Sequence, residues 1–140
     1  MKVIFDTVVL VRGLIDPFSW SGKLLFDWPG TYEWVISPEI AKEYLDVLNR
    51  PRLSGRFLAH ENRDLNKILE LMSHATVVNP PRVPVVSRDP CDDKFLAAAE
   101  FCGADYLVSE DNDLLSLSVY EGTRICTPVV VLRELGQADR

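Results

Sequence analysis

The sequence predicts an α/β fold in which a parallel sheet is covered by helices on both faces. Short apolar runs alternate along the chain with longer stretches whose apolar residues recur at helical spacing. This alternation is typical of strand–helix–strand units in a parallel sheet. The chain has 140 residues, of which 47% are hydrophobic, and this is about the size of one domain with one continuous core. We therefore expect residues 1–140 to form a single domain.

Short apolar runs are predicted to be the strands, and the stretches between and after them have helical periodicity. In chain order, the predicted strands cover residues 3–5, 34–36, 76–78, 106–108 and 124–126. The helices are predicted at residues 8–15, 21–28, 38–50, 61–74, 90–103, 111–117 and 128–136. Ser37 and Pro38 mark one helix start clearly, because a capping hydroxyl followed by proline at the first helical position is a typical helix start.

The composition argues against several classes of protein. No apolar run approaches the roughly 18 residues of a membrane-spanning helix, and the first residues lack a leader-like pattern, so we expect a cytoplasmic protein with no membrane partner. Three widely spaced cysteines match no zinc pattern and suit a reducing compartment. The net charge of −6 argues against coating of nucleic acid by general electrostatic attraction. It is compatible with a nuclease whose acids bind a metal, because bound cations reverse the local field.

Asp92 is the acid with the most distinctive position. On the helix that begins near residue 90, it falls at the centre of the apolar face with Leu96 and Ala99, whereas Asp93 falls on the solvated side beside Glu100. A carboxylate on an apolar face has to be paired, protonated or metal-bound, because an isolated buried charge is costly. The alternative is that Asp92 only interacts with the helix dipole and the open amides of the first turn.

Other acids are expected at one edge of the sheet. Asp6 directly follows the first predicted strand, and Asp111 and Asp113 follow the fourth. Open parallel sheets place their ligands at the carboxyl ends of the strands. Glu43 lies at the margin of the apolar stripe of its helix, from which it can face the same edge. Ser109 or Asp111 could instead cap the next helix, but a cap explains one of these residues and not the others.

Acids gathered at one edge predict a bound cation. Neighbouring carboxylates repel one another, and some would be protonated at neutral pH without a compensating positive charge. The sequence shows no lysine or arginine beside these acids in a motif-like position. Oxygen ligands without cysteine or histidine select Mg²⁺ or Mn²⁺ over zinc. We therefore expect Mg²⁺ or Mn²⁺ as the cofactor.

Several segments, spread over nearly the whole chain, carry a resemblance to a known family. They are VIFDTVVL at 3–10, SPEIAKEYLDVLNRP at 37–51, RDPCDDKFLAAAEFCGADYLVSEDNDLL at 88–115 and TPVVVL at 127–132. With these segments the chain resembles the PIN-domain ribonucleases, in particular the VapC-like toxins of toxin–antitoxin pairs. The third segment is the most specific, because an aspartate opens an alanine-rich helix and is followed by a strand and then Ser-x-Asp-x-Asp.

The resemblance implies a three-layer α/β/α fold with a parallel five-stranded sheet, and metal-dependent cleavage of RNA. Carried over position by position, it implies that Asp6, Asp92 and Asp111 are metal ligands, directly or through water. It implies that Glu43 orients or deprotonates the attacking water. Asp113 is expected to help hold a second, weaker ion, and all five acids are candidate catalytic residues.

One position departs from the family, and it keeps an alternative open. Relatives often have asparagine two residues after the first aspartate, where this chain has Val8. The alternative is a catalytically inactive PIN-fold module that binds RNA or a partner protein. A receiver-type domain would need an acid after the third strand and a lysine after the fifth, and the sequence has neither. Val8 also excludes a phosphatase of the Asp-x-Asp-x-Thr kind.

The family implies three partners, namely an RNA substrate, a cognate antitoxin protein and a second copy in a homodimer. Residues 49–56 form the densest basic stretch and could follow RNA phosphates. Alternatively, they are cations favoured at a helix C-terminus and in a solvated loop. Trp20 is the tryptophan that we expect to be exposed, and its segment is the candidate contact for the antitoxin or the second copy.

Overall fold

The computed structural model describes residues 1–28, 30–50, 63–81 and 90–138, and a mixed sheet lies at its centre. The strands are β1 (Lys2–Phe5), β2 (Glu33–Ile36), β3 (Thr76–Val77), β4 (Tyr106–Val108), β5 (Val119–Tyr120) and β6 (Thr123–Cys126). The strands predicted from the sequence are all present and pair in parallel in the order β3-β2-β1-β4-β6. The α/β class is therefore confirmed.

The expected strand number of five was wrong, because β5 adds an antiparallel edge strand beside β6 and the sheet has six strands. Tyr120 pairs with Thr123, and the two residues between them, Glu121 and Gly122, have φ values of 48° and 83°. Two consecutive residues with positive φ are typical of a tight hairpin turn. Val119 and Tyr120 form an apolar run of only two residues between Ser118 and Glu121, which is too short to predict a strand.

The helices also follow the predicted order. They are α1 (Thr7–Ile15), α2 (Trp20–Phe26), α3 (Pro38–Leu48), α5 (Arg63–Ser73), α6 (Asp93–Cys102), α7 (Asn112–Leu115) and α8 (Pro128–Ala138), with a 3-10 turn, η1 (Pro90–Asp92), before α6. Ser37 caps the N-terminus of α3 as predicted, since its hydroxyl accepts a hydrogen bond from the backbone N–H of Ile40 at 3.2 Å. No helix within the described ranges is long and apolar enough to cross a membrane.

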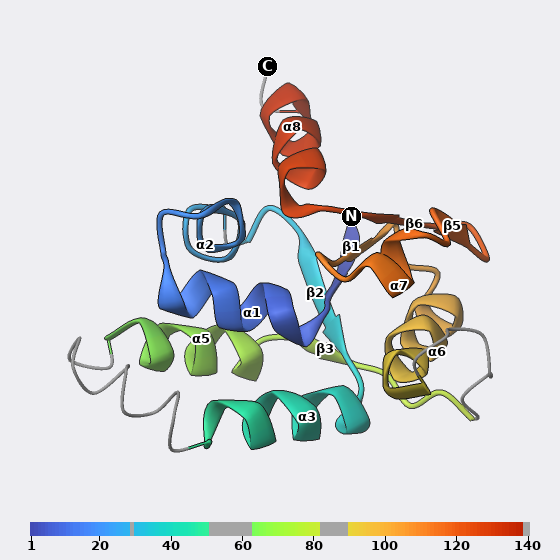
Figure 1. Cartoon of the computed structure of the whole chain (residues 1–140), viewed down its shortest axis with the longest axis horizontal. Coiled ribbons are helices and arrows are strands. Elements are labelled where there is room, and N and C mark those ends of the chain that lie inside the picture. Colours follow the sequence, from blue (N-terminus) through green and yellow to red (C-terminus); the bar gives the residue numbers. More distant parts are fainter. Residues whose placement is uncertain (29, 51–62, 82–89, 139–140) are drawn as a thin grey trace.

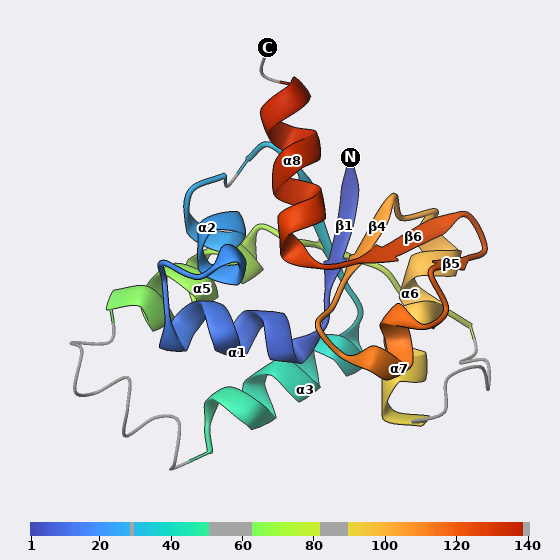
Figure 2. The ribbon, with the colours of Figure 1, turned by 45° about the horizontal axis from the view of Figure 1, so that its top comes forward.

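Helices cover both faces of the sheet (Figure 1, Figure 2). The chain runs from β1 at the centre outwards to β3 and then returns past β1 to β4. Since crossovers between parallel strands are right-handed, this reversal places α6 on the face opposite to α1 and α2. Figure 1 shows α6 on the right and α1 and α2 on the left. Helix α8 packs against α2 and so adds to the layer of α1 and α2.

Core contacts join α3 to the end of β1. Phe5 is fully buried, and its ring packs edge-to-face against Tyr32 and Trp34, with centroid distances of 5.6 and 5.4 Å. The hydroxyl of buried Tyr44 donates to the backbone carbonyl of Phe5. Burial raises the pKa of Tyr44, so this hydroxyl stays protonated and can act as the donor. These contacts fix α3 relative to the residue that follows β1.

The prediction that Trp20 is the exposed tryptophan is confirmed, and Trp20 begins α2. Trp20 is 54% exposed, whereas Trp34 is buried and Trp28 is intermediate. The ammonium of Lys23 lies 4.8 Å from the centroid of the Trp20 ring. Of the basic stretch 49–56, only the first two residues are described and both are exposed, so the prediction for that stretch falls mostly outside the described residues.

Candidate active site

The carboxyl ends of β1 and β4 lie side by side and place the first acid. Phe5 pairs with Val108 in register, so Asp6 and Ser109 follow the two strands at the same level. The backbone N–H of Asp6 donates to the Val108 carbonyl at 2.9 Å, and the Ser109 hydroxyl donates to the Asp6 carboxylate at 2.8 Å. The backbone N–H of Asp111 in turn donates to the Ser109 hydroxyl oxygen at 2.9 Å. Buried Ser109 therefore connects the acids that follow the two strands.

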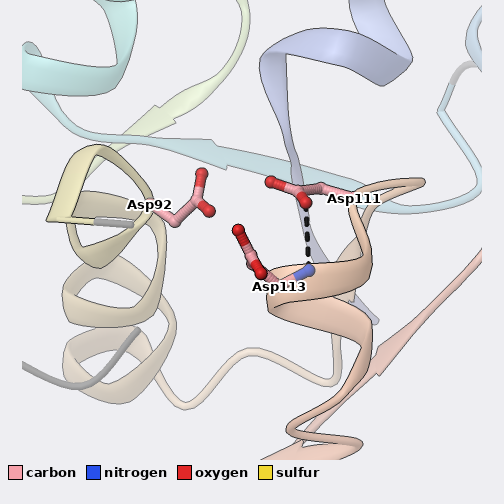
Figure 3. Close-up of side chains that lie close together, drawn as sticks. All are labelled: Asp92, Asp111 and Asp113. Atoms are coloured by element: carbon pink, nitrogen blue, oxygen red, sulfur yellow. Dashed lines mark hydrogen bonds between the residues drawn. The ribbon is translucent and has the colours of Figure 1, made fainter. Parts of the chain in front are cut away.

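A cluster of three carboxylates lies at this edge of the sheet (Figure 3). One carboxylate oxygen from each of Asp92, Asp111 and Asp113 lies within 4.8 Å of the other two. Asp92 ends η1, while Asp111 and Asp113 come from the start of α7, and Figure 3 shows the three side chains pointing toward one another. Asp111 also caps α7, since its carboxylate accepts from the backbone N–H of Asp113 at 3.0 Å. For Asp111, capping and membership of the acidic cluster are therefore compatible.

This donor set fits a hard divalent cation. The cluster consists of carboxylate oxygens alone, which Mg²⁺ and Mn²⁺ accept and which zinc sites rarely use without nitrogen or sulfur. Asp92 is only 7% exposed and makes no side-chain capping hydrogen bond to α6. Of the alternative considered for Asp92, the capping of first-turn amides by its side chain is therefore not observed.

Asp6 lies beside the cluster rather than within it. Its side chain is 4% exposed, and burial is the largest cause of its raised pKa. The hydrogen bond from Ser109 lowers this pKa, whereas the charges of Asp111 and Glu43 raise it further. The edge of the sheet thus holds an excess of negative charge that a cation would offset.

We expect Asp6→Asn to raise the thermal unfolding midpoint of the metal-free protein at pH 7 by about 2–4 °C, the shift that about 1 kcal/mol produces. Because the pKa of Asp6 is raised in the folded state, the proton stabilises the folded protein at acid pH. This contribution is lost as the pH rises through the folded-state pKa. The gain should therefore shrink as the pH falls toward 3.8, the ordinary pKa of the group. Thermal unfolding of both proteins, followed by circular dichroism with a chelator at several pH values, measures the difference between their midpoints. A lower midpoint for the variant than for wild type at pH 7 would contradict this prediction.

Glu43 faces the same edge from α3, and two neighbouring elements hold its carboxylate. The hydroxyl of Thr7, at the start of α1, donates to Oε2 of Glu43. The ammonium of Lys94, in the first turn of α6, donates to Oε1 at 2.5 Å. The sequence shows no lysine or arginine beside these acids in a motif-like position, but the fold brings Lys94 onto Glu43. Lys94 reaches Glu43 across the space between two helices, which spacing along one chain does not reveal.

Asp93 corrects a second expectation, because it is buried at 3% exposure rather than solvated. The prediction assumed a regular α-helix from residue 90 onward. The 3-10 turn Pro90–Asp92 ends before Asp93, which begins the regular α-helix α6, so its position around the helix relative to Glu100 is the expected one. The predicted solvent side of α6 is approached by β5, whose Tyr120 hydroxyl donates to Glu100 at 3.1 Å. The burial of Asp93 therefore depends on how other elements pack around α6, which a helical wheel does not report.

Three contributors to the site were missed from the sequence, namely Thr7, Tyr44 and Lys94. Thr7 directly follows Asp6, and Tyr44 directly follows Glu43. For Lys94 a signal existed, because a cation in the first turn of a helix opposes the helix dipole and calls for a local anion. Val8 is 50% exposed in the first turn of α1, so the position that departs from the resembling family is accessible to solvent.

Comparison with known proteins adds to this geometry. A family model described as PIN domain matches residues 2–113. The chain is also 33% identical to the uncharacterized protein MJ1680 of Methanocaldococcus jannaschii over 118 residues. These aligned residues cover 84% of this chain and 75% of that protein. The matched range of the family model begins in β1 and ends at Asp113. It therefore includes every acid of the site described above.

Proposed function

This chain belongs to the PIN domain family, and from that premise we propose that it is a Mg²⁺- or Mn²⁺-dependent endoribonuclease that hydrolyses RNA phosphodiester bonds. The family is one of nuclease-type domains. The observation that carries the proposal is the cluster of Asp92, Asp111 and Asp113 at the carboxyl edge of the sheet. An acidic cluster in a nuclease-type fold is best explained by a divalent ion that assists phosphodiester hydrolysis.

The residues of the site divide into two groups in this proposal. Asp92, Asp111 and Asp113 hold the ion, and Asp6 contributes directly or through water from beside the cluster. An ion bound there supplies Lewis-acid chemistry at the scissile phosphate and a more acidic water. Glu43 orients or deprotonates the attacking water, because its carboxylate is fixed at the same edge by donors from α1 and α6.

The first test is Mn²⁺ binding by calorimetry, followed by cleavage of single-stranded RNA of randomised sequence. We expect wild-type protein to bind Mn²⁺ and to cleave RNA with Mn²⁺ but not with excess chelator. Asp46→Asn is the control, since Asp46 is an exposed acid on α3 outside the cluster. Well-folded protein that binds no Mn²⁺ and cleaves no RNA in the pool would contradict the proposal.

A catalytically inactive binding module is the second candidate, and Val8 favours it. This half-exposed side chain stands where relatives often have asparagine. A binding module would bind RNA without cleaving it, and the Asp92→Asn variant would then bind RNA as wild type does. A gel-shift assay run beside the cleavage assay separates the two candidates.

We also propose that the nuclease is the toxin of a toxin–antitoxin pair, forms a homodimer and acts in the cytoplasm. The support is the resemblance of the four sequence segments to VapC-like toxins. Exposed Trp20 offers an apolar contact for a partner protein. Expression of the wild-type chain should arrest growth of a bacterial host, and expression of Asp92→Asn should not. Unimpaired growth with an active nuclease would argue against the toxin role.

A further inference from the structure

Lys94 occupies a position that its helix alone does not favour. It lies at the second residue of α6, where the partial positive charge of the helix N-terminus repels a cation. A lysine there is stabilised only if nearby acceptors compensate the repulsion. The structure supplies two, since the ammonium donates to Glu43 Oε1 at 2.5 Å and to the Cys91 carbonyl at 2.9 Å.

The ion pair between Lys94 and Glu43 is partly shielded from solvent. The side chains are 19% and 27% exposed, respectively. Salt screens such a pair less than a pair on the open surface, so the attraction between its two charges is weakened less. Because Cys91 belongs to η1, the same ammonium also forms a hydrogen bond to the turn that ends in Asp92. Lys94 therefore links Glu43 to the segment that carries one acid of the cluster.

Thr7 completes the restraint on Glu43 from the opposite side. Its hydroxyl donates to Oε2, while Lys94 donates to Oε1. Thr7 directly follows Asp6, just as Lys94 lies two residues beyond Asp92. A glutamate has three side-chain torsions and otherwise populates many rotamers. With one donor on each oxygen, its carboxylate is restricted to one orientation between two acids of the site.

We propose that Lys94 is a positioning residue that fixes the carboxylate of Glu43 for its role toward the attacking water. This inference rests on the proposed ribonuclease function and deepens it. A different role is conceivable on geometric grounds, because Lys94 lines both a pocket of about 110 Å³ beside Ser37 and an open basin of about 410 Å³ beside Lys42. From either hollow, the ammonium could contact an RNA phosphate directly.

A double-mutant cycle separates these two roles. The cycle compares wild type, Lys94→Met, Glu43→Gln and the double variant in Mn²⁺-dependent RNA cleavage. If Lys94 acts through Glu43, Lys94→Met should lower kcat about tenfold, a part of the 100- to 10,000-fold that a general base contributes, with KM changed less than about twofold. In the Glu43→Gln background, the same substitution should have almost no further effect.

Two further variants sharpen the cleavage experiment. Lys94→Arg keeps the positive charge, and we expect it to recover most of the lost kcat. Lys42→Met removes an exposed cation from the same basin and should leave kcat unchanged. An equal loss of kcat from Lys94→Met in both backgrounds, or a loss confined to KM, would overturn the inference and assign Lys94 to direct RNA contact.

Urea unfolding of the same four metal-free proteins distinguishes failure of this inference from failure of the proposed function. If wild type cleaves no RNA, the ribonuclease proposal fails, while the unfolding cycle still tests the contact. Coupled residues should give a double variant whose unfolding midpoint falls by less than the sum of the two single losses. Midpoint losses that simply add would overturn the positioning role, whatever the cleavage result.

Discussion

Asp92→Asn is expected to abolish Mn²⁺ binding and to lower RNA cleavage at least about 1,000-fold, the scale of losing a group that acts on the transition state. Asn has almost the shape of Asp, so the substitution opens no cavity. It removes one of the three charges whose oxygens lie within 4.8 Å of one another. The ligand set then has one anionic oxygen donor fewer, and hard divalent ions bind through such oxygens.

The fold of this variant should remain intact, because asparagine keeps the size and shape of aspartate and α6 loses no side-chain capping bond. Calorimetry with Mn²⁺, a cleavage assay and circular dichroism together measure the three expectations. Asp93→Asn is a poor control, since Asp93 is buried. The exposed Asp46 provides the matched control, and Asp46→Asn should behave as wild type. Equal losses in both variants would contradict the assignment of Asp92.

Glu43→Gln is expected to lower cleavage about 100- to 1,000-fold, within the range for removal of a general base, while Mn²⁺ affinity changes little. Glu43 lies outside the cluster of three acids, and both of its oxygens accept hydrogen bonds from protein donors. Glutamine keeps the length of the side chain and can still accept from Thr7. It loses the charge that pairs with Lys94 and that would draw a proton from water.

The measurement compares kcat with the Mn²⁺ affinity of the same preparation. Glu39→Gln, at an exposed position on the same helix, is the matched control and should retain full activity. Parallel loss of Mn²⁺ binding and cleavage in Glu43→Gln would make Glu43 a metal ligand instead. Unchanged cleavage would contradict both roles.

The sequence alone determined the order and type of the main elements. The strands at residues 3–5, 34–36, 76–78, 106–108 and 124–126 and the helix start at Ser37 were predicted from periodicity and capping, and all are present. These features depend on residues that are neighbours along the chain, so local patterns report them. For the same reason, the inward position of Asp92 was visible on a helical wheel.

Only the tertiary structure decided which groups meet at the edge of the sheet. It placed Asp113 in the cluster with Asp92 and Asp111, left Asp6 beside that cluster, and brought Lys94 onto Glu43. Each of these contacts joins side chains from different elements, and their distances depend on how helices pack across the sheet. Periodicity along one element contains no information about such distances. The chain therefore revealed which acids were candidates, while packing determined which of them share a site and which side chains hold them there.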